Sequence, residues 1–526
     1  MLDLRTPITT KLALAIGTIL ASSAIDAAVI TVTNTANTGD GSLRWAVEQA
    51  NSNADPDNVI VFDAAVNGQT IVLDSRLQVT KTLLITGNGM DETVIDANGG
   101  ESVFEIYNSA DRVELQQLSL TGGGSFSGFG GAINTYSREL VLQHVRITNS
   151  TSYQGGAIHH APLQPGSLLE INNSEISGNT VPGMTTASSG GGIHAMLYGD
   201  NSQIRIASSQ IRSNCAYVGG GLSVETGGML PIVGQSTIIE YSEINNNICA
   251  AWGGGVRVSA AGAHLLSIMT SSIEGNSAYF GGGIHANGGV FVNYSLISGN
   301  VATEAGGGAY LLLSDVPPTS NGLVFNHSTI SGNVAHGQAA GIMLASTYSA
   351  QAPFDLALRH STIAFNRSDA ETPWQPYGSG VSNLTPWALE VDHSIVTNNR
   401  VWPLFVPGVD YGLRDLDGSF DARWSLLGFR SPTTTVIEGD GVQNVISAAL
   451  WGLADNGGLT RTHKIFSDSP ARDAGDPDYE PPLGLNVDQR FDSNFVRVFN
   501  GRVDIGAFES QIDMVFASSF DNHQQD

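Results

Sequence analysis

The sequence predicts an all-β protein: a right-handed parallel β-helix, or solenoid, with a short N-terminal capping helix and a β-rich closing domain at its C-terminal end. Two recurring markers predict this fold, an Ile-x-x-Asn motif every 24 to 35 residues and a glycine cluster that precedes an apolar residue. Between the markers, runs such as 290–297 alternate apolar and polar residues, as strands with one buried face do. Such coils cannot bury their apolar edges alone, so they must stack.

The asparagine of the first marker is predicted to form a ladder along the stack. Asparagine tolerates the left-handed backbone of a tight corner, and its amide can bond to the asparagines in the coils above and below. Each such bond contributes roughly 1 kcal/mol. The residues assigned to this structural ladder are Asn179, Asn214, Asn247, Asn276, Asn300, Asn333, Asn366 and Asn399.

The glycine cluster is predicted to form a second corner of each coil. Examples are 190–192 before Ile193 and 281–283 before Ile284. Glycine supplies positive φ and lets neighbouring coils approach closely. The right-handed sense rests on the general crossover rule for parallel strands. Nine or so marked coils at ~4.8 Å each correspond to a repeat body of roughly 45 Å.

The N-terminus is typical of an export signal. Arg5 and Lys11 precede an apolar run at 12–20 and then small residues, with cleavage expected after Ala24 or Ala27. We therefore expect the mature protein outside the cell or on the outer surface of a bacterium. A second apolar run of about 18 residues is absent from the sequence, so no transmembrane helix is expected.

The composition narrows the range of partners. The net charge is −26, lysine occurs only at Lys11, Lys81 and Lys464, and the sequence contains no basic stripe. Binding of nucleic acid or anionic lipid through phosphates is therefore not expected. The acidity favours solubility or the recruitment of cations.

The N-terminal part resembles a known family of exported proteins. An amphipathic helix is expected within 42–50 as a plug over the first coil. The overlapping segment Gly-Ser-Leu-Arg-Trp-Ala-Val at 41–47 resembles the Cys-Ser-Leu-Arg-Glu-Ala-Ile motif of secreted bacterial β-helix proteins, from which Gly41, Trp45 and Val47 depart. The coils resemble the Gly-Gly-Ala-Ile and Phe-x-x-Asn repeats of chlamydial polymorphic membrane proteins, with isoleucine in the phenylalanine place.

The C-terminal end is similar to the choice-of-anchor Q domain that closes many exported β-helix proteins. The resemblance is carried by four segments in order: Leu-Ala-Asp-Asn-Gly-Gly-Leu-Thr at 453–460, Ser-Pro-Ala-Arg-Asp-Ala-Gly at 469–475, Asp-Gln-Arg at 488–490 and Asp-Ile-Gly-Ala-Phe-Glu at 504–509. It implies a surface or extracellular location and no reaction. The chain then divides into a signal peptide (1–27), a cap with the first coils (28–115), the repeats (116–423), the choice-of-anchor Q-like domain (424–510) and a tail (511–526).

The two cysteines, Cys215 and Cys249, follow equivalent markers in consecutive repeats. Stacked coils lie roughly 4.8 Å apart, within the Cα separation that a disulfide tolerates. An exported protein also meets oxidising conditions. The offset from the marker differs by one residue, so a disulfide and a pair of buried free thiols both remain open.

A polar column after the glycine corner is the candidate binding surface. If Ile284 points inward, His285 points out, and the column forms a stripe along one sheet face. Such a stripe suits an extended glycan or polymer, and a solvated face with stacked side chains is the alternative interpretation. The candidate binding residues are His159, His194, Arg257, His285 and Tyr310.

Two further sets invite a metal or catalytic interpretation. Histidine recurs every 33 residues at one repeat position, which predicts a ladder rather than a site: His327, His360 and His393. An acidic segment partly matches a calcium loop but lacks its closing glutamate, and a glycine-centred turn is the alternative. The candidate metal residues are Asp415, Asp417 and Asp421. No cofactor other than calcium is expected.

The hypothesis that follows is a monomeric, non-catalytic surface protein that is adhesive or binds a polysaccharide or cell-surface ligand. The alternative is a polysaccharide lyase or glycoside hydrolase with a diverged site, and a third reading is a spacer without a ligand. Signature segments of β-helix polygalacturonases are absent from the sequence, and the coils are poor in acids. Glu225 and Glu243 are isolated candidates for the facing carboxylates of a glycosidase. No catalytic residue is assigned.

Overall fold

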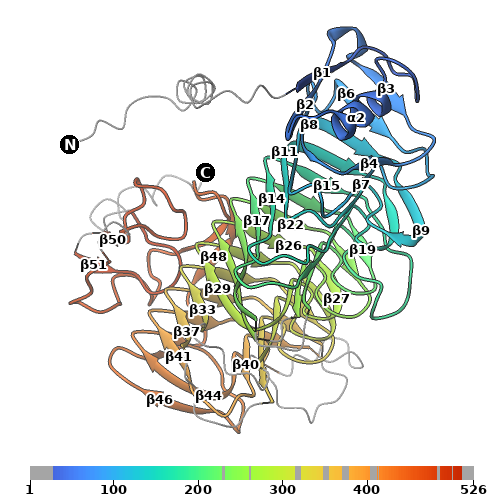
Figure 1. The fold of residues 1–526 in the computed structure, drawn as a ribbon. Coiled ribbons are helices and arrows are strands. Elements are labelled where there is room, and N and C mark those ends of the chain that lie inside the picture. Colours follow the sequence, from blue (N-terminus) through green and yellow to red (C-terminus); the bar gives the residue numbers. More distant parts are fainter. Residues whose placement is uncertain are drawn as a thin grey trace, which may run out of the picture.

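A computed structural model of the chain confirms the parallel β-helix. Strands make up 49% of the residues and helices 3%, and the strands form a parallel β-solenoid of about 12 turns (Figure 1). The structure describes residues 28–511 except 228–231, 260–261, 314–321, 348–354, 370–377, 403–411, 413, 483–485 and 500. The expected signal peptide, 1–27, and nearly all of the tail lie outside the described residues. Within those that are described, no helix is long and apolar enough to cross a membrane.

The predicted capping helix closes the N-terminal end of the stack. It is α2 (Leu43–Ser52), which contacts the first strands and buries Leu43, Ala46, Val47 and Ala50. The Ser42 hydroxyl caps it by accepting a hydrogen bond from the Trp45 N–H at 3.2 Å. The guanidinium of Arg44 donates to the backbone carbonyls of neighbouring loops, so this arginine of the motif pins the cap in place.

Each coil contributes strands to three faces, termed here face A, face B and face C. One complete coil consists of β16 (Ile193–Leu197) on face B, β17 (Gln203–Ala207) and β18 (Gln210–Arg212) on face A, and β19 (Cys215–Ala216) on face C. The next coil pairs with it in parallel and in register, so Ile193 lies beside Leu222. The triple glycine forms the corner between face C and face B.

The apolar residue of each marker points into the solenoid core. Ile211, Ile244, Ile284 and Ile297 are fully buried and belong to one hydrophobic cluster that runs along the whole stack. Burying a side chain of this size stabilises by about 1.5–3 kcal/mol, so the repeated isoleucines supply a large part of the stability. The inward direction expected for Ile284 is therefore observed.

The asparagines of the Ile-x-x-Asn marker stand in one buried column. The Nδ2 of each asparagine donates to Oδ1 of its neighbour in the next coil, at 3.0 Å from Asn276 to Asn300 and at 2.9 Å from Asn333 to Asn366. The same Oδ1 also accepts the backbone N–H of the preceding asparagine, as from Asn276 N to Asn300. Asp415 is the last rung, because its Oδ1 accepts both the Nδ2 and the backbone N–H of Asn399 at 2.8 Å.

Face A bends once in every coil at a non-glycine residue with left-handed backbone. These residues have φ between +44° and +53°. A serine follows each of the later ones, and its hydroxyl fixes the bend: Ser328 donates to the carbonyl of Asn326 at 2.8 Å and accepts the N–H of Ser295 at 3.2 Å. The positions are His144, Asn173, Ser208, Tyr241, Thr270, Tyr294, His327, His360, His393 and Trp424.

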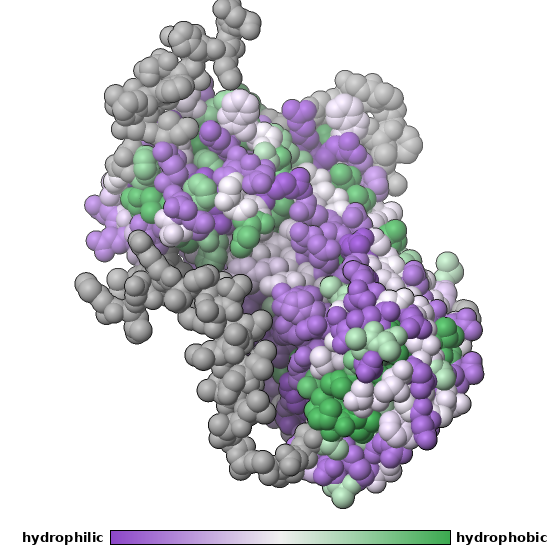
Figure 2. Space-filling view, turned by 90° about the horizontal axis from the view of Figure 1, so that it is seen from above, coloured by the Kyte–Doolittle hydropathy of each residue, from purple (hydrophilic) through white to green (hydrophobic). Residues whose placement is uncertain are grey.

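The closing domain folds back along face A of the last coils. Solenoid pairing continues past residue 423 to β47 (Gln443–Asn444). Two antiparallel pairs follow, made of β48 (Leu450–Ala454) with β49 (Thr462–Ile465) and β50 (Val498–Phe499) with β51 (Arg502–Val503). Figure 1 shows this domain on one side of the stack, beside β29 (Gly289–Asn293), β33 (Leu323–Asn326), β37 (Leu356–Arg359) and β41 (Leu389–Asp392). Figure 2, which looks onto the N-terminal end, shows mainly hydrophilic residues interspersed with hydrophobic patches.

Candidate functional site

The column predicted to form a polar stripe is assembled in register on face B. The structure differs from the expectation of an open stripe, however, because His159 is only 3% exposed and His194 is fully buried. The glycine corner lies directly on the column, so that a Cβ added to Gly253 would come within 2.8 Å of the Arg257 Cβ. The members follow one another in the order Asn134, His159, His194, Ser223, Arg257, His285 and Tyr310.

The polar groups of this column are only partly paired, and both ring nitrogens of His194 have no hydrogen-bond partner. Arg257 forms an ion pair with Glu225 at 2.5 Å, and the rings of His285 and Tyr310 stack with centroids 5.4 Å apart. Burial, and then the charge of Arg257, lower the pKa of His194 to about 3. A ligand therefore cannot reach the first half of the column, and its second half is half-buried.

The recurring histidines form a stack of rings on the outer side of face A, which we term the ring column. Ring centroids lie 4.9 Å apart for Tyr294 and His327, and 4.7 Å apart for His327 with His360 and for His360 with His393. Trp424 ends the column at 6.5 Å from His393. Burial holds the pKa of His327 and His360 well below the usual value, so these rings are neutral and can stack without repulsion.

The closing domain is clamped onto the ring column by hydrogen bonds. Arg497 donates from Nη2 to Nδ1 of His360 at 2.9 Å, and the N–H of Asp476 donates to Nε2 of His393 at 2.9 Å. The Tyr479 ring packs against both imidazoles, with centroids 4.8 Å and 5.2 Å away. His360 and His393 therefore serve as a docking surface within the chain.

The Asp-Gln-Arg segment of the closing domain makes a second set of contacts with the coils. Gln489 is fully buried, donates from Nε2 to the carbonyl of Ser295 at 3.1 Å and accepts the Thr329 hydroxyl at 2.5 Å. Arg490 and Asp488 form a buried ion pair at 2.6 Å beside it. This segment holds the closing domain in register with the repeats, which gives the motif a structural role.

The three aspartates of the calcium-loop pattern do not converge, which corrects the expectation of a metal site. Asp415 ends the asparagine ladder, and burial raises its pKa to about 7. Asp417 lies on face B and accepts the hydroxyl of Ser431 at 2.5 Å, while Asp421 is exposed on face A. Among the described residues, no three His, Cys, Asp or Glu side chains are placed to hold a metal ion.

The two cysteines are free, so the disulfide alternative is wrong. The one-residue offset sets Cys215 beside Ile248 and Cys249 beside Ala216 in the next coil. Neighbouring residues of a strand point to opposite sides, so the two sulfur atoms face away from each other. Cys249 is buried, and Cys215 is only half-buried.

A row of aromatic residues lies at the corner just before the glycine clusters, and we term it the aromatic corner. Tyr279 is 43% exposed, and Phe129 and Tyr153 are each 37% exposed. Trp252 and Phe280 pair across adjacent coils and are half-buried. Five coil steps separate Phe129 from Phe280, or about 24 Å. Figure 1 places β9 (Gly124–Phe129) and β27 (Ser277–Phe280) on the side of the stack away from the closing domain.

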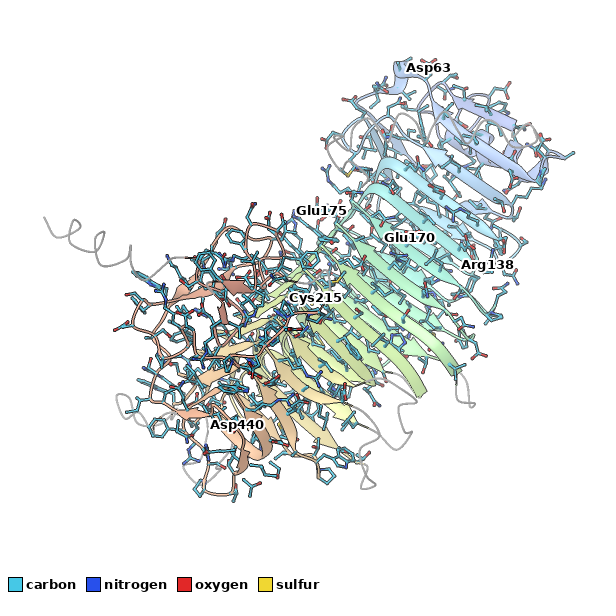
Figure 3. All side chains as sticks on the ribbon, turned by 90° about the vertical axis from the view of Figure 1, so that its left-hand side faces the viewer. Asp63, Arg138, Glu170, Glu175, Cys215 and Asp440 are labelled. Atoms are coloured by element: carbon cyan, nitrogen blue, oxygen red, sulfur yellow. The ribbon has the colours of Figure 1, made fainter. Side chains whose placement is uncertain are left out.

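A cleft of about 580 Å³ lies where the closing domain meets the last coils, and we term it the closing-domain cleft. The solenoid contributes Asp392, Arg423 and Trp424, and the closing domain contributes Asp476, Tyr479 and Glu480. Figure 3 shows the closing domain over the lower coils, with Asp440 at the lower end of this region, whereas Glu170 and Glu175 lie on coils that it leaves open.

Neither of these two surfaces was predicted from the sequence. The sequence does contain a pattern that could have predicted the aromatic corner, because an aromatic residue directly precedes the glycine cluster at Phe129, Trp252 and Phe280. No local sequence pattern predicts the closing-domain cleft, because its walls come from separate segments that meet only when the closing domain folds back.

Comparisons with known proteins do not show a family for this chain. Neither a known family model nor a curated protein matches the sequence. Among solved structures, the chain is similar to ORF18 of Geobacillus virus E2, with 9% identity and a TM-score of 0.29. The match covers 77% of this chain and 65% of that one, so this chain spans a little less than two thirds of its length.

Proposed function

We propose that this chain is an exported protein of the bacterial surface or extracellular space that binds an extended neutral glycan without cleaving it. The observation that carries the proposal is the aromatic corner, whose rings follow the long axis of the solenoid on its uncovered side. The expected signal peptide and the resemblance to secreted β-helix and choice-of-anchor Q proteins support the location.

The chemistry of the corner fits a sugar polymer. Aromatic side chains present large apolar surfaces at a low cost in conformational entropy, and tyrosine adds a polar hydroxyl. Phe280 also contacts the half-buried Tyr310 of the face B column, with ring centroids 5.2 Å apart, so that column borders the binding surface. The net charge of −26 disfavours a polyanionic ligand.

The face B column itself is not proposed as the binding or catalytic surface. His194 has no exposed surface, and Arg257 already pairs with Glu225. A reacting group must lie within hydrogen-bond reach of its substrate, which buried side chains of this column do not offer. The corner residues therefore replace the column as the proposed contact set.

Binding to a panel of neutral polysaccharides tests the proposal. We expect saturable binding by isothermal titration calorimetry, weakened at least tenfold in the double variant Trp252→Ala with Tyr279→Ala. Tyr198→Ala is the matched control, because Tyr198 is 36% exposed but lies at the corner between faces B and A. Absence of binding across the panel rejects the proposal. Release of reducing ends or unsaturated sugars favours the hydrolase or lyase alternative instead.

A further inference from the structure

The closing-domain cleft has the composition of a site for a cationic organic ligand. Its volume of about 580 Å³ is in the range of small-molecule sites, and its walls come from two parts of the chain that dock firmly on each other. We propose that it binds a ligand that carries ammonium groups on a carbon skeleton, either an oligomeric amino sugar or a free polyamine. This site is separate from the aromatic corner and does not depend on glycan binding there.

The side chains that line the cleft carry an excess of negative charge. Six carboxyl side chains line it, against one guanidinium, that of Arg423. This guanidinium is already engaged, since it lies 3.2 Å from Asp392 and 3.0 Å from Glu390. A cleft walled by protein concentrates such a one-sided field and attracts a cation. The six are Asp392, Asp421, Asp440, Asp476, Asp478 and Glu480.

The histidine in the cleft does not offset this charge. His393 accepts the backbone N–H of Asp476 at Nε2, at 2.9 Å, so that nitrogen carries no proton. Its Nδ1 lies 2.8 Å from the Asp392 carboxylate and donates to it. Both ring nitrogens are therefore engaged by groups of the chain itself, and the carboxylates outnumber the cationic side chains of the cleft.

The remaining lining distinguishes an organic cation from a metal ion. Asp421 projects from face A and Asp476 from the opposite wall, and no three acidic or histidine side chains of the described residues converge on one point. Metal ions need such convergence, whereas several ammonium groups along a chain do not. Trp424 and Tyr479 add apolar ring surface, which suits the carbon skeleton and attracts ammonium groups.

Calorimetric titration with three probes tests the assignment on the full-length protein. A glucosamine tetramer carries amines on a sugar skeleton, its N-acetylated counterpart is the neutral control, and spermidine carries amines without sugar. Binding of the glucosamine tetramer alone supports the proposal and identifies an amino sugar. Binding of spermidine as well supports it and shows that the amines suffice. Binding of neither amine overturns it, and so does equal binding of the acetylated tetramer to the variant Trp252→Ala with Tyr279→Ala, in which the proposed neutral-glycan surface is removed.

Variants locate the binding in the cleft. The double variant Asp421→Asn with Asp440→Asn should raise the Kd of the amine probes at least tenfold, because it removes two of the six carboxylates. Both side chains are exposed, so the fold should be unaffected. Trp252→Ala with Tyr279→Ala should leave amine binding unchanged, which separates this site from the aromatic corner. Unchanged affinity in the aspartate variant contradicts the assignment even if glycan binding at the corner fails.

Discussion

Arg497 donates a hydrogen bond from Nη2 to Nδ1 of His360 across 2.9 Å, and both side chains are buried where the closing domain meets the ring column. The carbonyls of Asp504 and Gly506 also lie within hydrogen-bond distance of this Nη2, at 2.7 Å and 2.6 Å, so its two hydrogens are shared among three acceptors. One side chain thus joins the closing domain to a coil that lies 137 residues earlier in the chain. The closing domain is fixed by polar contacts as well as by packing.

Replacement of Arg497 by methionine should loosen the closing domain. Three acceptors lose their donor and the nearby Glu509 carboxyl loses its cation, 3.9 Å away, so a loss of about 3–5 kcal/mol is expected. Denaturant unfolding followed by circular dichroism measures it, and limited proteolysis should cleave before β48 first. Arg205→Met is the control, because Arg205 is exposed and only 3.9 Å from its partner Glu240. Equal loss in both variants contradicts the clamp.

The fold was predictable because its causes repeat. Residues equivalent to Ile244 and Asn247 recur at the same positions in neighbouring coils. Each coil must bury its apolar face against the next, so a single repeated sequence pattern is enough to predict the whole stack. The ring column was predicted as a ladder for the same reason. The left-handed bend at Tyr294 and His327 explains why bulky rings are tolerated there, since the side chain leaves the face and stacks on its neighbour.

The surfaces were less predictable, because exposure depends on what covers a residue. Alternation places His194 outward from Ile193, and nothing in that pattern states that the glycine corner lies over it. Likewise, Asp415 was read with Asp417 as part of a loop, although a coil return makes it the last rung of the asparagine ladder. The spacing of residues in the sequence therefore predicted the columns of stacked side chains, but not which other residues bury them.

The asparagine ladder should contribute strongly to stability. In Asn300→Ala, the N–H and Nδ2 of Asn276 lose the oxygen that accepts them, and the carbonyl of Ile273 loses its donor. Buried groups without partners cost about 1–3 kcal/mol each, so a total loss of about 3–5 kcal/mol is expected in denaturant unfolding. Asn245→Ala is the control, because Asn245 is half-buried and outside the ladder, and it should cost under about 0.5 kcal/mol. Similar costs for the two variants would reject the ladder.

The two cysteines should differ in reactivity. Burial raises the pKa of Cys249 to about 11, so its reactive thiolate is disfavoured at neutral pH. Cys215 is half-buried and should react first with iodoacetamide in the native state, with both reacting after denaturation. Peptide mass spectrometry identifies the modified residue. Recovery of a disulfide-linked peptide from the native protein would contradict the assignment of Cys215 and Cys249 as free thiols.

Stability should fall as the pH falls from about 7 to 5. Burial lowers the pKa of eight histidines below the ordinary 6.5, so below that pH the unfolded chain takes up protons that the folded chain does not, and folding becomes less favourable. They are His159, His160, His194, His264, His285, His327, His360 and His463.

Three carboxyl groups act in the opposite direction. Burial raises the pKa of Asp415 to about 7, of Asp504 to about 6, and of Glu509 well above its usual value. The folded chain therefore binds these protons more readily than the unfolded chain, and their contribution improves as the pH falls through the same range. Eight histidines outweigh three acids, so a lower Tm at pH 5 than at pH 7 is expected in calorimetry.

Substitution of one histidine tests the cause of this pH dependence. Both ring nitrogens of His194 lack a hydrogen-bond partner, so His194→Leu removes a titrating group without leaving another group unpaired. Stability at pH 7.5 should change little, and the loss between pH 7.5 and 5 should shrink, because each pKa unit corresponds to about 1.4 kcal/mol. His144→Leu is the control, because His144 is exposed. If His194→Leu retains the full loss, buried neutral imidazoles do not set the acid sensitivity of this solenoid.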